Sequence, residues 1–488
     1  MKKKLLTVAL SALLLASCSD SVTSLASTET SSETTTETTS ETTVETTSEE
    51  ESESSSAVAT SDEDDLIDAI DGTSLVELND YSDEFKSAEL ETTYEVDTTV
   101  DLSTVTDSYT ISVAGTFLFT GSATNVQIIV NVDGEKVHVI LDDATITNQN
   151  IACIYVKAAD KVYVTTADGT TNTLTSTGEI ADDEDEDLNA TIYSKDDLVI
   201  NGLGTLNVNS EENGITANDD FKVTGGTLYV TADNHGIRAN DSIRITLSTL
   251  YIDAGKDGLH AENDDLDSYV YVEDGTVYIA SVDQAIQASY EFYNAGGTIY
   301  IVSQDEGIKA AQINLIGGEL NIVAGDDGLN ASNKELENLF INIVGGKLDI
   351  FAEGDGIDSN GAVYISGGYT KIVQANESKS LLNYDGTMTI TGGTLIGVGS
   401  KDDFKSNESA VQGTIQTEIN SSGDIAVRDA DGALIASVFT DESYQTVFVT
   451  SPELLLDGTY TIATESTSKE FVLTDLNYND VTAEEVVE

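Results

Sequence analysis

The chain has 488 residues and a formal net charge of -67, from 88 acidic and 21 basic side chains. This excess of negative charge opposes binding to nucleic-acid phosphates and to anionic membranes or polymers, unless a divalent cation lies between the two. One proline, no tryptophan and 38 glycines, among many Asn, Asp and Thr residues, favour short strands and tight turns over helices.

Residues 1–18 are predicted to form a lipoprotein signal peptide. A basic start at Lys2 to Lys4 precedes an apolar stretch, Leu5 to Ala16, that is too short to span a membrane in the mature protein. The stretch ends in Leu-Ala-Ser-Cys, which resembles the lipobox of bacterial lipoproteins. This resemblance implies cleavage before Cys18 and lipidation of that residue. A plain secretory signal with an incidental cysteine is the alternative.

We therefore expect a protein on the extracellular face of the bacterial cell membrane, attached to it only through the lipid anchor. Residues 19–65 are mainly Ser, Thr and Glu and bury too little to offset their ordering entropy, so we expect a disordered stalk. Residues 66–107 are predicted to be an N-terminal extension and cap. Cys153 is the only cysteine besides Cys18, which leaves no disulfide within the folded part.

An internal repeat occupies residues 108–400. The sequence Gly-Gly-Thr-Leu-Tyr-Val at 225–230 returns in related form at 274–279 and 296–301, with weaker Gly-Gly copies further on. A second motif, Gly-Ile/Leu-x-Ala, alternates with it; it begins at residues 214, 236, 258, 307, 328 and 356, with a degenerate copy at 285. The two long intervals indicate insertions at one corner, after Leu259 and after Leu329.

A period of about 22 residues with three short alternating runs predicts an all-β fold, a right-handed parallel β-helix with three sheets. Alternate residues of each run point inward, so equivalent Leu, Ile and Ala side chains stack in columns from coil to coil. Propeller blades need longer repeats, and leucine-rich repeats need asparagine and leucine patterns that this sequence lacks. Residues 401–488 lose the period. The runs on either side of Asp431-Gly432 predict a hairpin in a small C-terminal β module that caps the last coil.

Three stretches resemble one known family. They are the run from Tyr193 to Leu206, the coils with Asp-Gly-Ile and Gly-Gly, and the tail with Ser443 to Leu454 and Gly458 to Thr461. Over residues 85–475 the chain is similar to the calcium-binding, polysaccharide-binding β-helix proteins first described in cellulolytic clostridia. The resemblance implies a pectate-lyase-like β-helix that binds calcium and plant-type polysaccharides, including polygalacturonate, without established catalysis.

Acidic residues recur around the glycine of the second motif. Carboxylates stacked one coil apart repel each other by about 1 kcal/mol or more per pair, whereas Ca²⁺ collects six to eight oxygen ligands. We therefore predict Ca²⁺ as the cofactor at this acidic corner; the alternative is ordinary Asp-Gly turns on an acidic surface. The candidate ligands are Asp257, Asp264, Asp265, Asp305, Glu306, Asp326, Asp327, Asp355 and Asp358.

Tyrosines form two outward columns. Tyr229, Tyr251, Tyr278 and Tyr300 occupy one position in four consecutive coils, and Tyr271 and Tyr293 occupy a neighbouring column. Exposed aromatic rings beside amides are suited to stacking on sugars, so these six residues are candidates for carbohydrate binding. A tyrosine ladder that only stabilises the sheet is an equal alternative.

These patterns predict a calcium-dependent, cell-surface polysaccharide-binding protein, with a pectin- or polygalacturonate-like chain or a β-glucan as ligand. We expect a monomer with no catalytic residues. One alternative is an adhesin or structural display protein without a glycan ligand, and a second is a β-helix polysaccharide lyase. A lyase needs a distinct cationic base. Arg238 and Lys309 share a column with His260, but basic residues on an acidic face usually form ion pairs.

Overall fold

A computed structural model describes residues 72–183, 187–400 and 411–479. Residues 1–59 and 60–488 form separate units, and every described residue belongs to the second. The predicted signal peptide, the lipidation site Cys18 and the predicted stalk lie outside the described residues. In the described part of the chain, no helix is long and apolar enough to cross a membrane.

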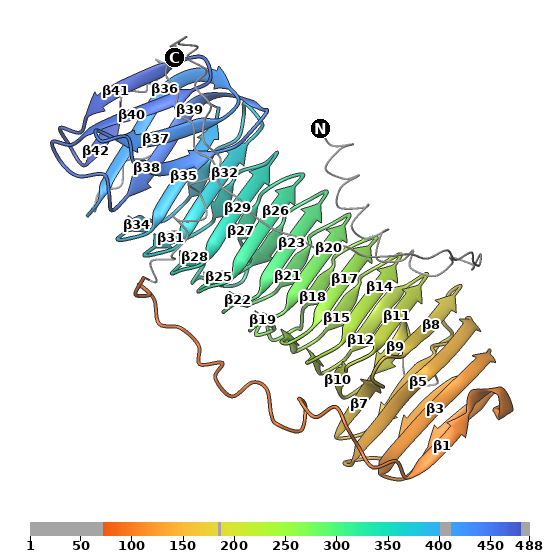
Figure 1. Ribbon diagram of the computed structural model, residues 1–488. Coiled ribbons are helices and arrows are strands. Elements are labelled where there is room, and N and C mark those ends of the chain that lie inside the picture. The colour runs from red at the N-terminus through yellow and green to blue at the C-terminus, as the bar shows by residue number, and fades with distance from the viewer. Residues whose placement is uncertain (1–71, 184–186, 401–410, 480–488) are drawn as a thin grey trace, which may run out of the picture. The chain divides into compact units, whose positions relative to one another are not determined.

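The predicted parallel β-helix is confirmed: the chain forms about 13 turns of about 23 residues each, with almost no helix (Figure 1). A turn contributes one strand to each of three faces, and each strand pairs in parallel with its equivalent in the next turn. The register keeps repeat positions in line, so that Leu228, Leu250 and Val277 form one buried inward column.

The short-strand face follows the Gly-Ile/Leu-x-Ala motif. It consists of β2 (Ser108–Ile111), β4 (Gln127–Asn131), β6 (Ile154–Ala158), β9 (Ala190–Ser194), β12 (Asn213–Ala217), β15 (Ile237–Ala239), β18 (Leu259–Ala261), β21 (Ile286–Ala288), β24 (Ile308–Ala310), β27 (Leu329–Ala331), β30 (Ile357–Ser359) and β33 (Leu382–Tyr384). Its Ile and Leu side chains point into the core, as the motif predicted.

The second face, here called the strap face, precedes each Gly-Gly turn. It consists of β7 (Lys161–Thr166), β10 (Asp197–Gly202), β13 (Asp220–Val223), β16 (Ser242–Ile245), β19 (Tyr269–Val272), β22 (Glu291–Asn294), β25 (Gln312–Leu315), β28 (Phe340–Ile343), β31 (Ala362–Ile365) and β34 (Met388–Ile390).

The third face, the ladder face, follows the same turn. It consists of β8 (Thr171–Thr177), β11 (Thr205–Ser210), β14 (Thr227–Ala232), β17 (Thr249–Ala254), β20 (Thr276–Ser281), β23 (Thr298–Ser303), β26 (Glu319–Ala324), β29 (Lys347–Ala352), β32 (Tyr369–Gln374) and β35 (Thr394–Gly399). At the N-terminal end, β1 (Thr98–Asp101), a 3-10 turn η2 (Leu102–Thr104), β3 (Gly115–Thr124) and the long β5 (Lys136–Gln149) complete the first turns.

Residues 72–97, part of the predicted N-terminal extension and cap, form a strap along the strap face. Gly72 donates its N–H to the Val344 carbonyl, 2.8 Å away, just after β28. At the other end, the Tyr94 ring lies 4.2 Å from that of His138 in β5. The strap therefore runs against the direction of the solenoid and crosses the turns from β28 back to β5.

The C-terminal β module follows β35. Within it, β39 (Ser443–Ser451) pairs antiparallel with both β35 and β36 (Gly413–Ser422), and β42 (Asn477–Asn479) joins β36. A separate antiparallel sheet contains β37 (Ile425–Asp429), β38 (Leu434–Val438), β40 (Thr459–Thr464) and β41 (Ser468–Val472). The hairpin expected around Asp431-Gly432 is β37–β38.

Candidate functional site

The polar column that precedes each motif glycine has a structural role that the sequence did not reveal. In this column, a side-chain oxygen of one residue accepts a hydrogen bond from the backbone N–H of the equivalent residue in the next turn. Asn213 accepts from His235 at 3.1 Å, Asp257 from Gln284 at 3.0 Å, and Asp327 from Asp355 at 2.7 Å. Each of these residues therefore uses one oxygen to hold successive coils together.

Several of the predicted metal ligands are compensated by neighbouring side chains. Glu306 accepts a hydrogen bond from Lys309 at 2.7 Å, and the Gln284 amide contacts both Glu306 and Asp305. Lys379 lies 3.3 Å from Asp326. Burial and the adjacent Glu306 raise the pKa of Asp305 to about 6. Cations and amides thus reduce much of the carboxylate repulsion from which Ca²⁺ was predicted at this corner.

Asp327, Asp355 and Asp358 form a compact aspartate cluster, and the Lys379 ammonium lies 3.7 Å from an oxygen of Asp327. Each offers a carboxylate oxygen, and these oxygens lie within 4.8 Å of one another. Asp327 and Asp355 are buried, and Asp358 is half-buried. Burial, followed by the charges of Asp327 and Asp355, raises the pKa of Asp358 to about 6. The arrangement concentrates negative charge that a cation would neutralise.

Three of the predicted ligands, Asp257, Asp264 and Asp265, are not brought together in the structure. Asp264 and Asp265 are exposed, and within the described residues they join no group of metal-ligating side chains. Asp257 instead lies between His235 and His260, whose Nδ1 atoms are 3.3 and 2.6 Å from its Oδ2. Burial works to raise the pKa of Asp257, but the two imidazoles outweigh it and lower the pKa to about 2.

The tyrosines of the ladder face stack on one another. The centroids of Tyr229, Tyr251, Tyr278 and Tyr300 are 4.7, 4.8 and 4.9 Å apart in succession, with interplanar angles of 7°, 1° and 6°. Tyr251 and Tyr278 pack both ring faces against neighbouring tyrosines, and the two end rings pack one face each, so the ladder presents mainly ring edges and hydroxyl groups to solvent. Tyr300 at the end of the stack is 39 % exposed. This geometry favours the stabilising ladder over stacking on sugar rings.

Tyr271 and Tyr293 are covered by the strap, so the expectation that they are exposed is wrong. They are only 4 % and 9 % exposed. The Tyr81 ring of the strap stacks on Tyr271 at 4.7 Å and meets Tyr293 edge-on at 4.9 Å. Nothing in the repeat indicated this, because the strap itself does not repeat.

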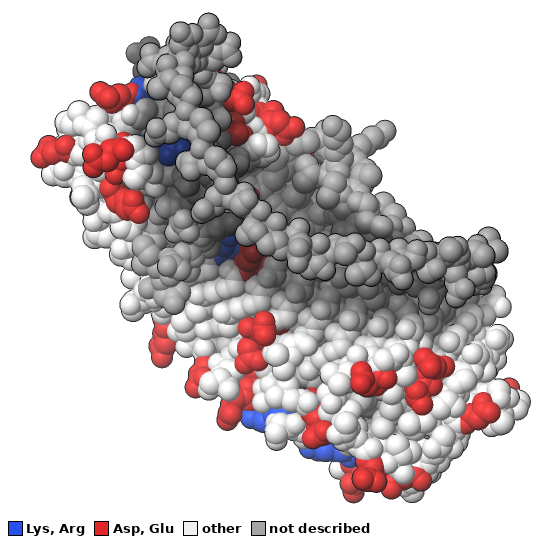
Figure 2. Space-filling model, viewed as in Figure 1, with Lys and Arg blue, Asp and Glu red and all other residues white. Residues whose placement is uncertain are grey.

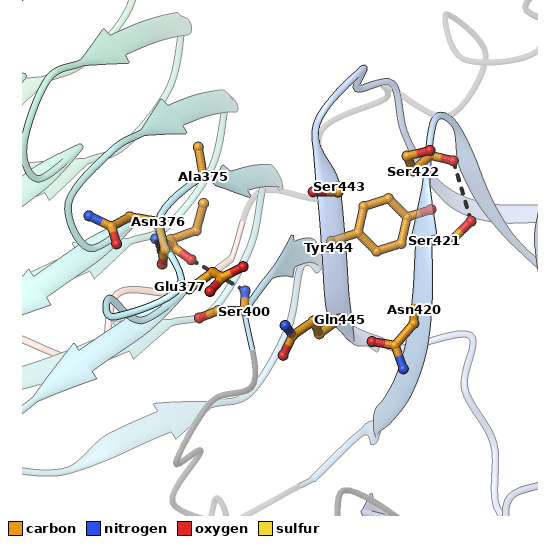
Figure 3. A pocket seen from close by; sticks show the side chains of 11 residues that line it. Ala375, Asn376, Glu377, Ser400, Asn420, Ser421, Ser422, Ser443, Tyr444 and Gln445 are labelled. Carbon is orange, nitrogen blue, oxygen red and sulfur yellow. Dashed lines mark hydrogen bonds between the residues drawn. The ribbon is translucent and has the colours of Figure 1, made fainter.

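A polar pocket of about 440 Å³, which the sequence did not indicate, lies between the last turns and the C-terminal module (Figure 3). Amides and hydroxyls dominate its walls, and Glu377 is its one charged side chain. The lining residues are Gln374, Ala375, Asn376, Glu377, Ser400, Asn420, Ser421, Ser422, Ser443, Tyr444 and Gln445. By contrast, acidic side chains are spread over the face shown in Figure 2, with few basic ones among them.

Comparisons with known proteins found a matching family model, a similar sequence and a similar solved structure. Residues 106–311 and 293–440 match a family model described as carbohydrate-binding domain-containing protein. A protein of the same description from Acetivibrio thermocellus is 42% identical over 116 residues, which are 23% of this chain and 41% of that relative. This chain therefore matches less than half the length of that relative. The solved structure of a polysaccharide lyase-like protein from C. thermocellum, a gadolinium derivative, has 31% sequence identity and a TM-score of 0.43; the match covers 45% of this chain and 98% of that one.

Proposed function

Because this chain belongs to the family of carbohydrate-binding domain-containing proteins, we propose that it binds an acidic, pectin-like polysaccharide through Ca²⁺ and does not cleave it. The observation that carries this proposal is the aspartate cluster of Asp327, Asp355 and Asp358. Its three carboxylates come from two consecutive turns, and no described residue donates a hydrogen bond to Asp358. That carboxylate is therefore available to a cation.

Calcium would make attraction to an acidic polymer possible. A chain with a formal charge of -67 repels polygalacturonate. Ca²⁺ takes six to eight oxygen ligands, more than three carboxylates supply when Asp327 and Asp355 each also use one oxygen to hold the next coil. Water and sugar carboxylates would complete the coordination, so that the cation bridges two negative partners. We further propose attachment to the outer face of the cell membrane through Cys18, and a monomeric state.

The test is calorimetric titration of polygalacturonate into the full-length protein, with Ca²⁺ and with a chelator. We expect binding only with Ca²⁺, and a loss of affinity of about 10-fold or more for Asp358→Asn. The matched control is Asp168→Asn, the same chemical change in an exposed loop between β7 and β8. In the same samples, absorbance of unsaturated uronides should not rise with time. Equal binding in chelator would rule out the calcium bridge, and sustained calcium-dependent product would favour the lyase.

A neutral polysaccharide such as a β-glucan is the second candidate ligand, favoured by the nearly uncharged polar pocket. Amides and hydroxyls can hydrogen-bond sugar hydroxyls without a cation. In that case Gln445→Ala would weaken binding to a β-glucan, and a chelator would have no effect. If neither polymer binds, the display or adhesin function becomes the better explanation.

A further inference from the structure

We propose that His235, Asp257 and His260 form a site for a divalent ion of the zinc class, separate from the aspartate cluster. The chain has three histidines, and two of them lie on consecutive turns around one carboxylate oxygen. Their ring centroids are 4.3 Å apart. The two Nδ1 atoms and the Asp257 oxygen all lie within 4.8 Å of one another.

Both nitrogens of the His260 ring face carboxylates. Nδ1 is 2.6 Å from Asp257 and Nε2 is 3.0 Å from Glu262. A neutral imidazole has a single N–H, so the second contact needs either another proton or a metal ion between nitrogen and oxygen. Metal-bound histidines almost always donate their other N–H to a carboxylate or carbonyl. Glu262 is placed to accept that hydrogen bond and to leave Nδ1 as the metal ligand.

The surroundings of the other two ligands, His235 and Asp257, also leave their ligand atoms in positions that suit a cation. Nδ1 of His235 is buried and has no hydrogen-bond partner among the described residues, because its 3.3 Å approach to Asp257 lacks the direction of a hydrogen bond. Asp257 is fixed by its other oxygen, which accepts the N–H of Gln284. Its Oδ2 is thereby held toward the histidines.

The two nitrogen ligands and one oxygen ligand of this site favour Zn²⁺ over Ca²⁺. Imidazole nitrogens suit Zn²⁺ and neighbouring transition metals, whereas Ca²⁺ prefers oxygen. Zn–N and Zn–O distances of about 2.0–2.2 Å put tetrahedral ligands about 3.3 Å apart, so small side-chain shifts would close this site around the ion. Arg238 lies in register with His260 and opposes a cation there, but the nearby Glu262 carboxylate offsets its charge. One coordination position would remain for water.

The test is a Zn²⁺ titration of the full-length protein in excess Ca²⁺, followed by elemental analysis after desalting. We expect one retained zinc ion per chain. Asp257→Asn should weaken zinc binding by about 10-fold or more, and Glu262→Gln by about 10- to 100-fold. The asparagine keeps an oxygen for the N–H of Gln284, as Asn213 does for His235, so the coil should still fold. His138→Gln, at the remaining histidine, is the matched control and should bind zinc like the wild type.

Two results would overturn the proposal: no zinc retained by the folded wild type, or equal retention by wild type, Asp257→Asn and His260→Gln. Circular dichroism of each variant verifies its fold. The proposed polysaccharide function is tested independently, because Asp358→Asn should keep its zinc, while Asp257→Asn should keep calcium-dependent binding to polygalacturonate.

Discussion

At the residue scale, Glu89 shows how the strap is held. Its side chain is 1 % exposed and lies 2.6 Å from the Lys161 ammonium and 3.0 Å from that of Lys222. The Glu89 carbonyl also accepts hydrogen bonds from Asn201 and Thr224. Burial works to raise the pKa of Glu89, but hydrogen bonds from Lys161, the Lys86 backbone and Lys222 outweigh it, and the pKa lies below its ordinary value.

Glu89→Gln should release the strap at neutral pH. Removing one partner of a buried ion pair costs about 3–5 kcal/mol, because the other charge is left without compensation. We expect faster hydrogen exchange over residues 79–94 and a lower denaturant midpoint. Because the folded pKa is depressed, the contribution of Glu89 is present above its ordinary pKa of 4.5 and is lost as the pH falls below it. The difference between variant and wild type should therefore shrink in acid.

Glu91→Gln provides the comparison, since Glu91 lies in the same strap but is exposed. It should change exchange and midpoint little at any pH. If Glu91→Gln destabilised the strap as much as Glu89→Gln does, the buried ion pair would not be the cause.

At the scale of elements, one glycine column fixes the corner between the strap face and the ladder face. These glycines have left-handed φ angles, and each lies against the backbone of the preceding turn. A Cβ at Gly346, where φ is +76°, would lie 2.6 Å from the Gly318 carbonyl oxygen. The column comprises Gly226, Gly275, Gly297, Gly318, Gly346, Gly368 and Gly393.

Gly346→Ala should therefore destabilise the solenoid by more than about 2 kcal/mol, which exceeds the cost of left-handed backbone alone. Gly134→Ala is the matched control: φ is +69° there too, but a Cβ meets nothing within 4 Å. It should cost only about 1–2 kcal/mol. Denaturant unfolding of the two variants measures the difference, and equal costs would contradict the role of close coil packing.

Features that repeat could be predicted from the sequence, and features that do not repeat could not. The alternation of Leu228 and Tyr229, renewed in each coil, was enough to predict inward and outward columns in correct register. The strap that covers Tyr271 follows no repeat, and neither does the polar pocket beside Tyr444. The side-chain partners of the aspartates within a column could not be predicted from the sequence either. Whether an aspartate contacts a lysine, a histidine or another aspartate depends on turns 20 or more residues away.

At the scale of the whole molecule, charge should couple stability to calcium. The chain carries a formal charge of -67, and self-repulsion of this kind destabilises compact states. If Ca²⁺ binds the folded protein and not the unfolded chain, it should stabilise it by about 2.7 kcal/mol at 100 times the dissociation constant. Scanning calorimetry should show a higher melting temperature with Ca²⁺ than with chelator.

In Asp358→Asn the calcium-dependent rise should be smaller than in the wild type, whereas Asp168→Asn should reproduce the full rise. A rise of the same size with Mg²⁺ would point to general screening of charge, because Mg²⁺ demands a stricter octahedral geometry.

The reversed direction of the strap has a mechanical consequence. Tension applied through the chain that precedes Gly72 enters the solenoid beside Val344, far along the molecule from β1. The strap's contacts to Glu291, Arg244 and Lys161 would then break one after another, as in peeling, and each would bear the load alone. The 26 residues from Gly72 to Asp97 release roughly 85 Å of contour at about 3.3 Å per residue. A sudden pull on the strap would thus release extra chain length while the parallel coils behind it stay folded.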